Sequence, residues 1–174
     1  MSATETATAA LRLDDVHLAF DVRGVARPVL RGVSFEIKPG EAYGLVGESG
    51  CGKSTTAYAA VRYLAANGHV TGGSIEIAGE DVYGLSAEEL RELRARRISM
   101  VYQDPGQSLN PTIKVGKQVA EAFTVLGFSK EEAQAKSIEA LNRVRIADAE
   151  QVLDRYPYQL SGGMQQRVVI AMAL

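Results

Sequence analysis

The first residues that could carry out chemistry form the segment GESGCGKST, whose spacing is that of a phosphate-binding loop. Gly47, Gly52, Lys53 and Ser54 match the pattern G-x-x-x-x-G-K-[ST]. Glycines let the main chain wrap closely around phosphate oxygens and turn its N–H groups inward. Lys53 supplies a mobile positive charge for the β- and γ-phosphates, and the Ser54 hydroxyl is a ligand for Mg²⁺. The segment therefore predicts a site for a nucleoside triphosphate.

The loop is expected to bind along its whole length, mainly through its main chain. A chance match to the fixed positions arises in roughly one chain per hundred of this length, so the flanking elements have to support the interpretation. Thr55 can add a contact to the α-phosphate. Cys51 stands at a free position, where a small filler is favoured over a reactive thiol. The expected nucleotide-binding residues are Gly47, Glu48, Ser49, Gly50, Cys51, Gly52, Lys53, Ser54 and Thr55.

The elements around the loop have the order that such a site needs. Residues 41–47, EAYGLVG, form a compact apolar run that is typical of a strand buried on both faces. Helix formers follow from Lys53 to Ala66 and end at Asn67-Gly68. Alternating apolar residues predict three further strands that are half-buried. These residues are Val16, Leu18 and Phe20, then Val33, Phe35 and Ile37, and then Ile75 and Ile77.

The second half of the chain is mostly helical in pattern. Residues 98–103, ISMVYQ, predict another buried strand, and Asp104-Pro105-Gly106 breaks the chain after it. From Val115 to Arg145 apolar residues recur at helical spacing. This part is therefore expected to form a helical block.

Two helix starts carry capping boxes, Ser86 with Glu89 and Ser129 with Glu132. The first of these helices contains the basic stretch RELRARR, residues 91–97. Glutamates interleave with the arginines, which favours a solvated helix face over a surface for nucleic acid.

Composition excludes several classes of protein. The chain has 174 residues and a net charge of −2, which gives no general reason to expect nucleic acid or an anionic membrane as partner. Cys51 is the only cysteine, so an internal disulfide is impossible and a reducing compartment is expected. Residues 1–10 lack the pattern of a signal peptide and are expected to be a disordered lead-in. No apolar run approaches the roughly 18 residues that span a membrane. His17 and His69 have no metal-ligand spacing.

A second motif narrows the function. LSGGMQQR, from Leu160 to Arg167, resembles the signature motif of ABC (ATP-binding cassette) ATPases. Gln103, which ends ISMVYQ, resembles the Q-loop glutamine of the same family. The loop, QDPGQSLNP and YPYQLSGGMQQR together are similar to the ATP-binding subunits of dipeptide, oligopeptide and nickel importers. Met164 replaces the glutamine common at the fifth signature position, as it often does in that branch.

The resemblance implies an α/β fold, the P-loop NTPase fold of ABC type, with a RecA-like core, N-terminal antiparallel strands and an α-helical subdomain. Residues 11–104 and 161–174 would form the ATP-binding core, and 105–160 the helical subdomain that docks on membrane subunits. The family's strand ending in Asp-Glu and its switch histidine do not follow the signature motif in this sequence. The C-terminal part of the core is therefore expected to be missing, and the 174-residue chain to be inactive in hydrolysis.

The resemblance also implies roles for single residues. Lys53 and Gln103 would be catalytic, and Ser54 and Gln103 would contact Mg²⁺. Gln103 would contact the attacking water as well. Phe20 ends the first predicted strand and is the candidate for stacking on adenine, with core packing as an equal alternative.

The signature motif has a physical logic of its own. A serine followed by two glycines at a helix start offers a hydroxyl and N–H groups at the positive end of the helix dipole, which is an anion site. In the family this site binds the γ-phosphate of ATP held by a partner cassette, which implies a head-to-tail dimer with two ATP molecules. A structural N-cap is the simpler alternative. The residues expected to face the partner's ATP are Ser161, Gly162, Gly163, Met164 and Gln165.

The resemblance thus implies an ATP-binding subunit of an ABC importer for peptides or nickel, with ATP and Mg²⁺ as cofactors. It would lie in the cytoplasm, on the inner face of the cell membrane. Its partners would be a second ATPase subunit, transmembrane permease subunits and, indirectly, a periplasmic or extracellular solute-binding protein, but no nucleic acid. Two alternatives stay open: a non-transport ABC ATPase, and a degenerate nucleotide-binding module without turnover.

Overall fold

The structure is a computed structural model that describes residues 8–174. The chain divides into two compact units, one ending at Leu90 and the other beginning at Arg91. Each unit is described by itself. Most of the lead-in expected at residues 1–10 lies outside the described residues, and the first strand begins at Leu11.

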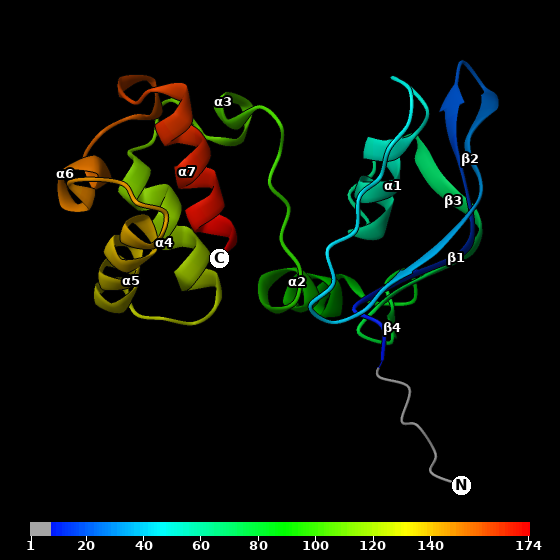
Figure 1. Cartoon of the computed structure of the whole chain (residues 1–174), viewed down its shortest axis with the longest axis horizontal. Coiled ribbons are helices and arrows are strands. Elements are labelled where there is room, and N and C mark those ends of the chain that lie inside the picture. Colours follow the sequence, from blue (N-terminus) through cyan, green and yellow to red (C-terminus); the bar gives the residue numbers. More distant parts are fainter. Residues whose placement is uncertain (1–7) are drawn as a thin grey trace, which may run out of the picture. The chain divides into compact units, whose positions relative to one another are not determined.

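The first unit is built on an antiparallel sheet with the strand order β2-β1-β3-β4 (Figure 1). Its strands are β1 (Leu11–Val22), β2 (Val25–Ile37), β3 (Gly68–Ile77) and β4 (Glu80–Asp81). The three strands predicted from alternation are therefore confirmed. Arg23 and Gly24 join β1 to β2, and both have positive φ angles, 52° and 76°, which suit a tight hairpin turn.

An irregularity in β1 sets which side chains enter the core. Asp15 has a φ angle of 47°, and the register with both neighbouring strands shifts there. Leu13 and Val16, three positions apart, are consequently both buried. Gly73 on β3 faces the bulge, and any side chain on it would collide with the carbonyl oxygens of Asp14 and Asp15.

One helix of the first unit, α1 (Lys53–Ala60), begins in the phosphate-binding loop. The sequence predicted it to continue to Ala66, which is wrong. Arg62 adopts a left-handed φ of 51°, which ends the helix. Its guanidinium group donates hydrogen bonds to the carbonyl oxygens of Val82 and Leu85. These tertiary contacts outweigh the local helix propensity.

The predicted strands at residues 41–47 and 98–103 are also wrong. Both segments are assigned to no strand, because a strand needs a hydrogen-bonding neighbour and no other described segment pairs with either of them. Val46 is 96% exposed as a result. The segment before the loop is held instead by Tyr43, whose ring stacks on Phe35 with centroids 4.9 Å apart.

The second unit is helical (Figure 1). Helix α2 (Ala87–Arg96) crosses the boundary between the units. The elements after it are α3 (Pro105–Ser108), α4 (Val115–Val125), α5 (Lys130–Arg143), α6 (Ala149–Leu153), the 3₁₀ turn η1 (Pro157–Gln159) and α7 (Gly162–Ala173). The helical block predicted between Val115 and Arg145 is confirmed.

The core of the second unit lies between α4, α5, α6 and α7. Its fully buried side chains include Val115 and Val119 of α4, Leu141 of α5 and Val168 of α7. Gly116 lets α4 approach α6 closely, since a Cβ atom there would lie 2.9 Å from the Leu153 carbonyl oxygen. The rest of the core consists of Leu109, Ala140, Ile146, Ala149, Val152, Leu160, Val169 and Ala171.

Both predicted capping boxes are present. The Ser129 hydroxyl accepts a hydrogen bond from the Glu132 amide, and the Glu132 carboxylate accepts one from the Ser129 amide at 2.9 Å. The bond that the carboxylate accepts from the Ser129 amide, and after it the interaction with the Ser129 side chain, favour the charged carboxylate and lower the pKa of Glu132. Ser86 and Glu89 make the same pair of bonds at the start of α2, and the pKa of Glu89 is lowered in the same way, the Ser86 side chain contributing most.

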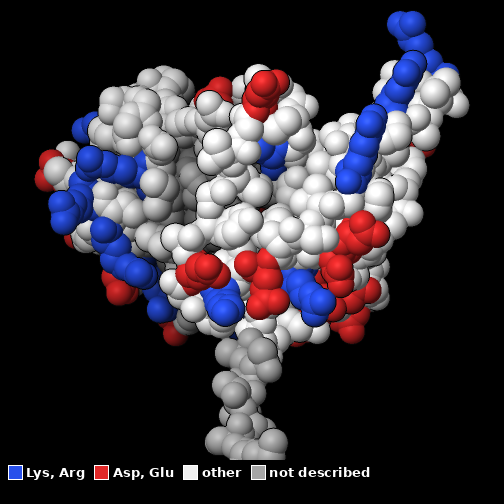
Figure 2. Space-filling model, turned by 45° about the vertical axis from the view of Figure 1, so that its right-hand side comes forward, with Lys and Arg blue, Asp and Glu red and all other residues white. Residues whose placement is uncertain are grey.

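The basic stretch has the predicted solvated character. Leu90 and Leu93 of α2 are buried, while the charged side chains between and after them are exposed. Arg96 pairs with Glu92 one helical turn earlier, at 3.3 Å. On the face in Figure 2, acidic and basic side chains alternate along the lower part of the molecule.

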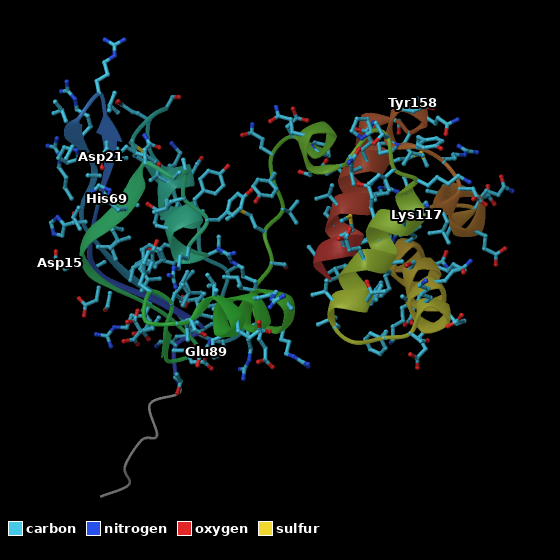
Figure 3. All side chains as sticks on the ribbon, turned by 180° about the vertical axis from the view of Figure 1, so that it is seen from behind. Asp15, Asp21, His69, Glu89, Lys117 and Tyr158 are labelled. Atoms are coloured by element: carbon cyan, nitrogen blue, oxygen red, sulfur yellow. The ribbon has the colours of Figure 1, made fainter. Side chains whose placement is uncertain are left out.

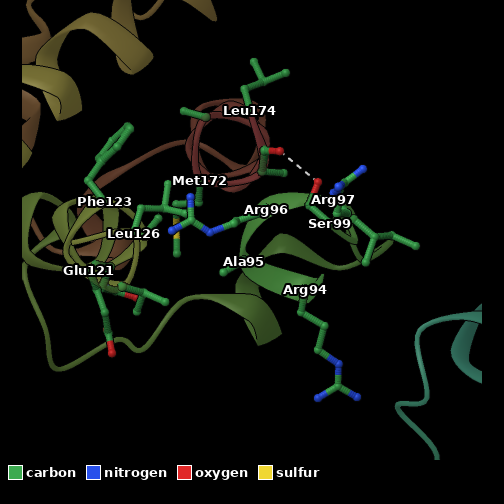
Figure 4. Close-up of a pocket in the computed structure, with 16 residues that line it drawn as sticks. Arg94, Ala95, Arg96, Arg97, Ser99, Glu121, Phe123, Leu126, Met172 and Leu174 are labelled. Carbon is green, nitrogen blue, oxygen red and sulfur yellow. Dashed lines mark hydrogen bonds between the residues drawn. The ribbon is translucent and has the colours of Figure 1, made fainter. Parts of the chain in front are cut away.

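A groove of about 510 Å³ in the second unit runs past the end of α7 (Figure 4). The hydroxyl of Ser99 donates a hydrogen bond of 2.8 Å to the Ala173 carbonyl oxygen there. Phe123 of α4, Leu126 directly after that helix and Met172 of α7 belong to its apolar lining. Among the described residues, no helix is long and apolar enough to cross a membrane.

Candidate nucleotide-binding site

The phosphate-binding loop lies on the surface of the first unit, between the segment held by Tyr43 and helix α1. Residues 47–51 are exposed, whereas Gly52 is buried at the start of the helix. Gly52 has a φ angle of 99°, and a Cβ atom on it would lie 2.8 Å from Leu30 Cδ2 of strand β2. The loop therefore needs glycine at position 52 both for its backbone conformation and for close packing on the sheet.

Lys53 is drawn back over the loop. Its ammonium group donates hydrogen bonds to the carbonyl oxygens of Gly47 at 2.8 Å and Glu48 at 2.6 Å. It also lies 3.6 Å from the sulfur of Cys51. The lysine thus points into the concave side of the loop, where an anion would meet it.

The start of α1 offers main-chain donors at the same place. The amide groups of Gly52, Lys53, Ser54 and Thr55 make no hydrogen bond to another described residue. Thr56 is the first residue whose amide is paired, with the Gly52 carbonyl oxygen. Free N–H groups at a helix start, next to an ammonium group, form the donor set that phosphate oxygens require.

The same residues fit a magnesium ion held mainly by phosphate oxygens. The Ser54 side chain is exposed and makes no hydrogen bond within the described residues, so its hydroxyl is available as a ligand. No cluster of three His, Cys, Asp or Glu side chains that could hold a metal by itself occurs among residues 8–174. This donor set suits Mg²⁺, which usually keeps several waters and binds through substrate phosphates.

Phe20 lies at the end of β1 and is half-buried. Its ring covers Gly68 on the neighbouring strand β3, where a Cβ atom would come within 2.5 Å of the ring. One face of the ring therefore packs on the sheet.

The two histidines pair with carboxylates on the same sheet. His69 Nδ1 lies 3.8 Å from Asp21 Oδ2, and the two side chains stand next to each other in Figure 3. His17 Nε2 lies 3.2 Å from Asp15 Oδ1. The side chains of both pairs are largely exposed.

The predicted signature site lies in the second unit at the start of α7. Ser161 is the N-cap, and its hydroxyl accepts a hydrogen bond from the Met164 amide at 3.3 Å. Gly162 and Gly163 are exposed, have no positive φ angle, and would leave a Cβ atom without a neighbour within 4 Å. Among the described residues, the fold therefore does not require glycine at either position.

Gln103 is exposed and directly precedes α3. The Asp104 carboxylate caps that helix by accepting a hydrogen bond from the Gly106 amide at 3.0 Å. Gln103 and the signature residues belong to the second unit, and the phosphate-binding loop to the first. Within the first unit the residues of the phosphate-binding loop lie together, and within the second unit the signature residues lie together at the start of α7.

Sequence reasoning missed two features near the predicted sites. Gln118 is buried, and its amide bonds the main chain of Asn110 and Ile113, which fixes the turn after α3. Tyr156 and Tyr158 stack at 5.6 Å just before the signature motif. The two tyrosines of YPYQ could have indicated the stacked pair from the sequence. For Gln118 the sequence offers no signal beyond its position on the inward face of α4.

A family model described as ABC transporter matches residues 30–174. The chain belongs to this family. The fold agrees with this family, because solved ABC ATPase cassettes match the chain over 94–95% of its length. The matching fold comprises the antiparallel N-terminal sheet, the loop before α1 and the helical unit.

Several curated relatives are similar to the chain. A probable peptide ABC transporter ATP-binding protein of Sinorhizobium fredii, y4tR, is 49% identical over 83% of this chain and 44% of its own length. The oligopeptide transport ATP-binding protein OppD of Salmonella typhimurium is 42% identical over the whole chain and 54% of its own length. The chain thus spans about half the length of these curated relatives.

The fold is also similar to solved cassettes. A dimeric structure of a post-hydrolysis state of the ATP-binding cassette MJ0796, bound to ADP and Pi, matches with a TM-score of 0.79 and 28% identity. It covers 94% of this chain and 68% of that one. The structure of cbiO1 from Clostridium perfringens, part of the transporter complex cbiONQ, matches with a TM-score of 0.74 and 25% identity over 95% of this chain and 61% of that one.

Proposed function

We propose that the chain binds ATP with Mg²⁺ at the loop from Gly47 to Thr55, as the nucleotide-binding part of a peptide importer ATPase. The observation that carries the proposal is the donor set at the start of α1: the unpaired amides from Gly52 onward, with the Lys53 ammonium group turned into the same loop. A cationic, amide-rich site at a helix start favours a polyphosphate over a neutral ligand.

Each residue of the loop has a separate task. The free amides of Gly52 to Thr55 would donate hydrogen bonds to phosphate oxygens. Gly47 to Cys51 would contribute chiefly the main chain of the loop. When ATP binds, the Lys53 ammonium group would exchange its hydrogen bonds to the loop carbonyl oxygens for bonds to the β- and γ-phosphates. Phosphate oxygens carry more negative charge than carbonyl oxygens and therefore bind the ammonium group more strongly. Ser54 would hold Mg²⁺, which when bound neutralises charge that develops during phosphoryl transfer.

Two further residues would complete the site. Gln103 would contact Mg²⁺ and the attacking water from its exposed position before α3. Phe20 would offer adenine the ring face that does not cover Gly68. Its half-buried position supports this role and core packing equally.

The signature residues Ser161 to Gln165 would serve a second cassette. The described fold does not require glycine at positions 162 and 163, because a Cβ atom there would meet no neighbour within 4 Å. This supports the proposal that an anion on another molecule approaches the main chain closely at these positions. Binding of one chain's ATP by the other's signature implies a head-to-tail dimer. The dimeric solved cassette MJ0796 supports this arrangement by similarity.

The proposed cargo rests on the relatives, which are named as ATP-binding proteins of peptide or oligopeptide transport. They support peptides over nickel. The importer subunit would work on the cytoplasmic face of a membrane, with residues 105–160 docking on permease subunits and residues 11–104 and 161–174 binding ATP. A solute-binding protein outside the membrane would deliver the cargo.

Two assays test the proposal. The 174-residue chain should bind ATP weakly and release phosphate only at background, because its sequence holds no Asp-Glu pair after the signature to polarise water. Turnover by this chain at the rate of a longer relative would contradict that. Affinity purification from the source cells should recover permease subunits; recovery of ribosomes or DNA instead would favour a non-transport ATPase.

A further inference from the structure

Gln165 has a bonding pattern that does not suit a residue facing a nucleotide. Its Nε2 donates hydrogen bonds to the carbonyl oxygens of Pro157 at 2.8 Å and Leu160 at 3.3 Å. Its Oε1 faces α3, where a Cβ atom on Gly106 would lie 3.7 Å away. The side chain is partly buried and links α7 to η1 and to Leu160, the residue after η1.

The turn that Gln165 holds is otherwise short and irregular. Tyr156 donates its amide hydrogen to Gln159 Oε1 at 2.8 Å, and the Tyr156 ring stacks on Tyr158, with centroids 5.6 Å apart and planes 10° apart. Tyr158 is 70% exposed, and Figure 3 shows it beside the start of α7. Among residues 8–174, the hydrogen bonds from Gln165 are the polar contacts that tie this turn to α7, and the buried Leu160 belongs to the apolar core that α7 shares.

The turn leads directly into the signature residues, so its orientation sets theirs. Leu160 is the last residue of the turn, and Ser161 follows it as the N-cap of α7. Any rotation of the Leu160 peptide would redirect both the Ser161 hydroxyl and the free amides that follow it. The Gln165 bond to the Leu160 carbonyl oxygen opposes that rotation.

We propose that Gln165 is a positioning residue, which fixes the Tyr156–Leu160 turn and thereby aims the signature site without touching the nucleotide itself. The orientation of the signature residues matters only if they bind the nucleotide of a second cassette, so this functional part of the proposal rests on the proposed function. The positioning itself depends on this chain alone and can be measured without nucleotide.

The decisive variants are Gln165→Met, which has no donor, and Gln165→Glu, whose charged form has none. The matched control is Gln166→Glu, because Gln166 is exposed and makes no side-chain hydrogen bond within the described residues. Hydrogen exchange across residues 156–164 should be about five- to tenfold faster in both Gln165 variants, the loss expected for one or two such bonds. Residues 130–143 of α5 should exchange as in the unsubstituted chain in all three variants.

Lowering the pH should restore slow hydrogen exchange of the turn in Gln165→Glu, because a protonated carboxyl group can again donate a hydrogen bond. The carboxyl introduced by Gln165→Glu faces two carbonyl oxygens, which raises its pKa and lets it donate a hydrogen bond once protonated. Relative to the unsubstituted chain at each pH, its turn should tighten between pH 7 and pH 5, while that of Gln165→Met should stay loose. Equal exchange in Gln165→Met and the unsubstituted chain would overturn the proposal.

The functional half is read from ATP binding and ATP-driven dimerisation. Both Gln165 variants should weaken ATP-driven dimerisation about tenfold while ATP binding by the monomer stays unchanged, and Gln166→Glu should alter neither. A loosened turn with normal dimerisation would overturn the aiming role. An unsubstituted protein that binds no ATP would instead refute the proposed function and leave the exchange result to decide on Gln165.

Discussion

The ammonium nitrogen of Lys53 lies 2.8 Å from the carbonyl oxygen of Gly47, the first residue of the same loop. The lysine thereby closes the loop on itself, with a second bond to the Glu48 carbonyl oxygen. A carbonyl oxygen carries only a partial negative charge, so phosphate oxygens compete well for the same ammonium group. Binding of a phosphate would therefore need only one change: the Lys53 ammonium group exchanges its carbonyl partners for phosphate oxygens.

Lys53→Met should lower the affinity for ATP by about 10- to 100-fold, the loss expected for hydrogen bonds to a charged group. The melting temperature should change little, because the lysine contacts only its own loop. Lys38→Met is the matched control, since that side chain is exposed and outside the loop. Calorimetric titration with ATP and Mg²⁺ measures the difference; equal affinities for both variants would refute the role of Lys53.

Gly52→Ala should destabilise the chain more than Gly50→Ala. Both residues have positive φ angles, 99° and 81°, which cost an alanine about 1–2 kcal/mol. Only at Gly52 would the new Cβ atom also lie 2.8 Å from Leu30 Cδ2, whereas it meets nothing within 4 Å at Gly50. Urea unfolding of both variants tests this, and equal midpoints would show that packing against Leu30 is unimportant.

Gly162→Ala should leave the free energy of unfolding unchanged or raise it by up to about 1 kcal/mol, because alanine favours a helix and the site has free space. In the full-length protein the same change should abolish ATP-driven dimerisation, since a methyl group would stand where the partner's phosphate must approach. Size-exclusion chromatography with and without ATP gives the readout. Normal dimers in this variant would argue for a purely structural N-cap.

Glu132→Gln should flatten the acid side of the stability curve. The pKa of Glu132 is lowered from its ordinary value of 4.5, mainly by the Ser129 amide. A carboxyl whose folded pKa lies below its unfolded pKa stabilises the fold above pH 4.5, and this contribution is lost as the pH falls through the folded value. Glutamine keeps an acceptor for the cap but does not titrate.

The measurement is urea unfolding between pH 6 and pH 3. Glu131→Gln is the control, because this neighbour in the first turn of α5 makes no bond to the Ser129 cap. An acid limb in Glu132→Gln as steep as in the control would mean that the capping box does not contribute to acid sensitivity.

Local patterns in the sequence predicted local structure well. The two capping boxes, the alternation in β1 to β3 and the inward face of α4 each depend on neighbours within a few residues, and all are present. The loop was recognisable because Gly52, Lys53 and Ser54 stand at fixed spacing before a helix. The capping boxes and the loop motif need no information about distant parts of the chain, whereas the alternation predicted β1 to β3 without showing how they pair.

The errors came where a distant partner decides the structure. Residues 41–47 and 98–103 are apolar enough for buried strands, but a strand forms only against a neighbour, and none of the described strands pairs with them. Helix α1 stops early because Arg62 reaches the carbonyl oxygens of Val82 and Leu85. The hydrogen-bond partners of Gln165 likewise lie outside the local motif and could be known only from the fold.

The central claim is that the loop around Lys53 binds ATP, and equilibrium binding to the 174-residue chain tests it most directly. A fluorescent ATP analogue should bind weakly but saturably in the presence of Mg²⁺, unlabelled ATP should displace it, and Lys53→Met should lose the signal while Lys38→Met keeps it. No saturable binding by the folded chain, or equal binding by Lys53→Met, would contradict the account.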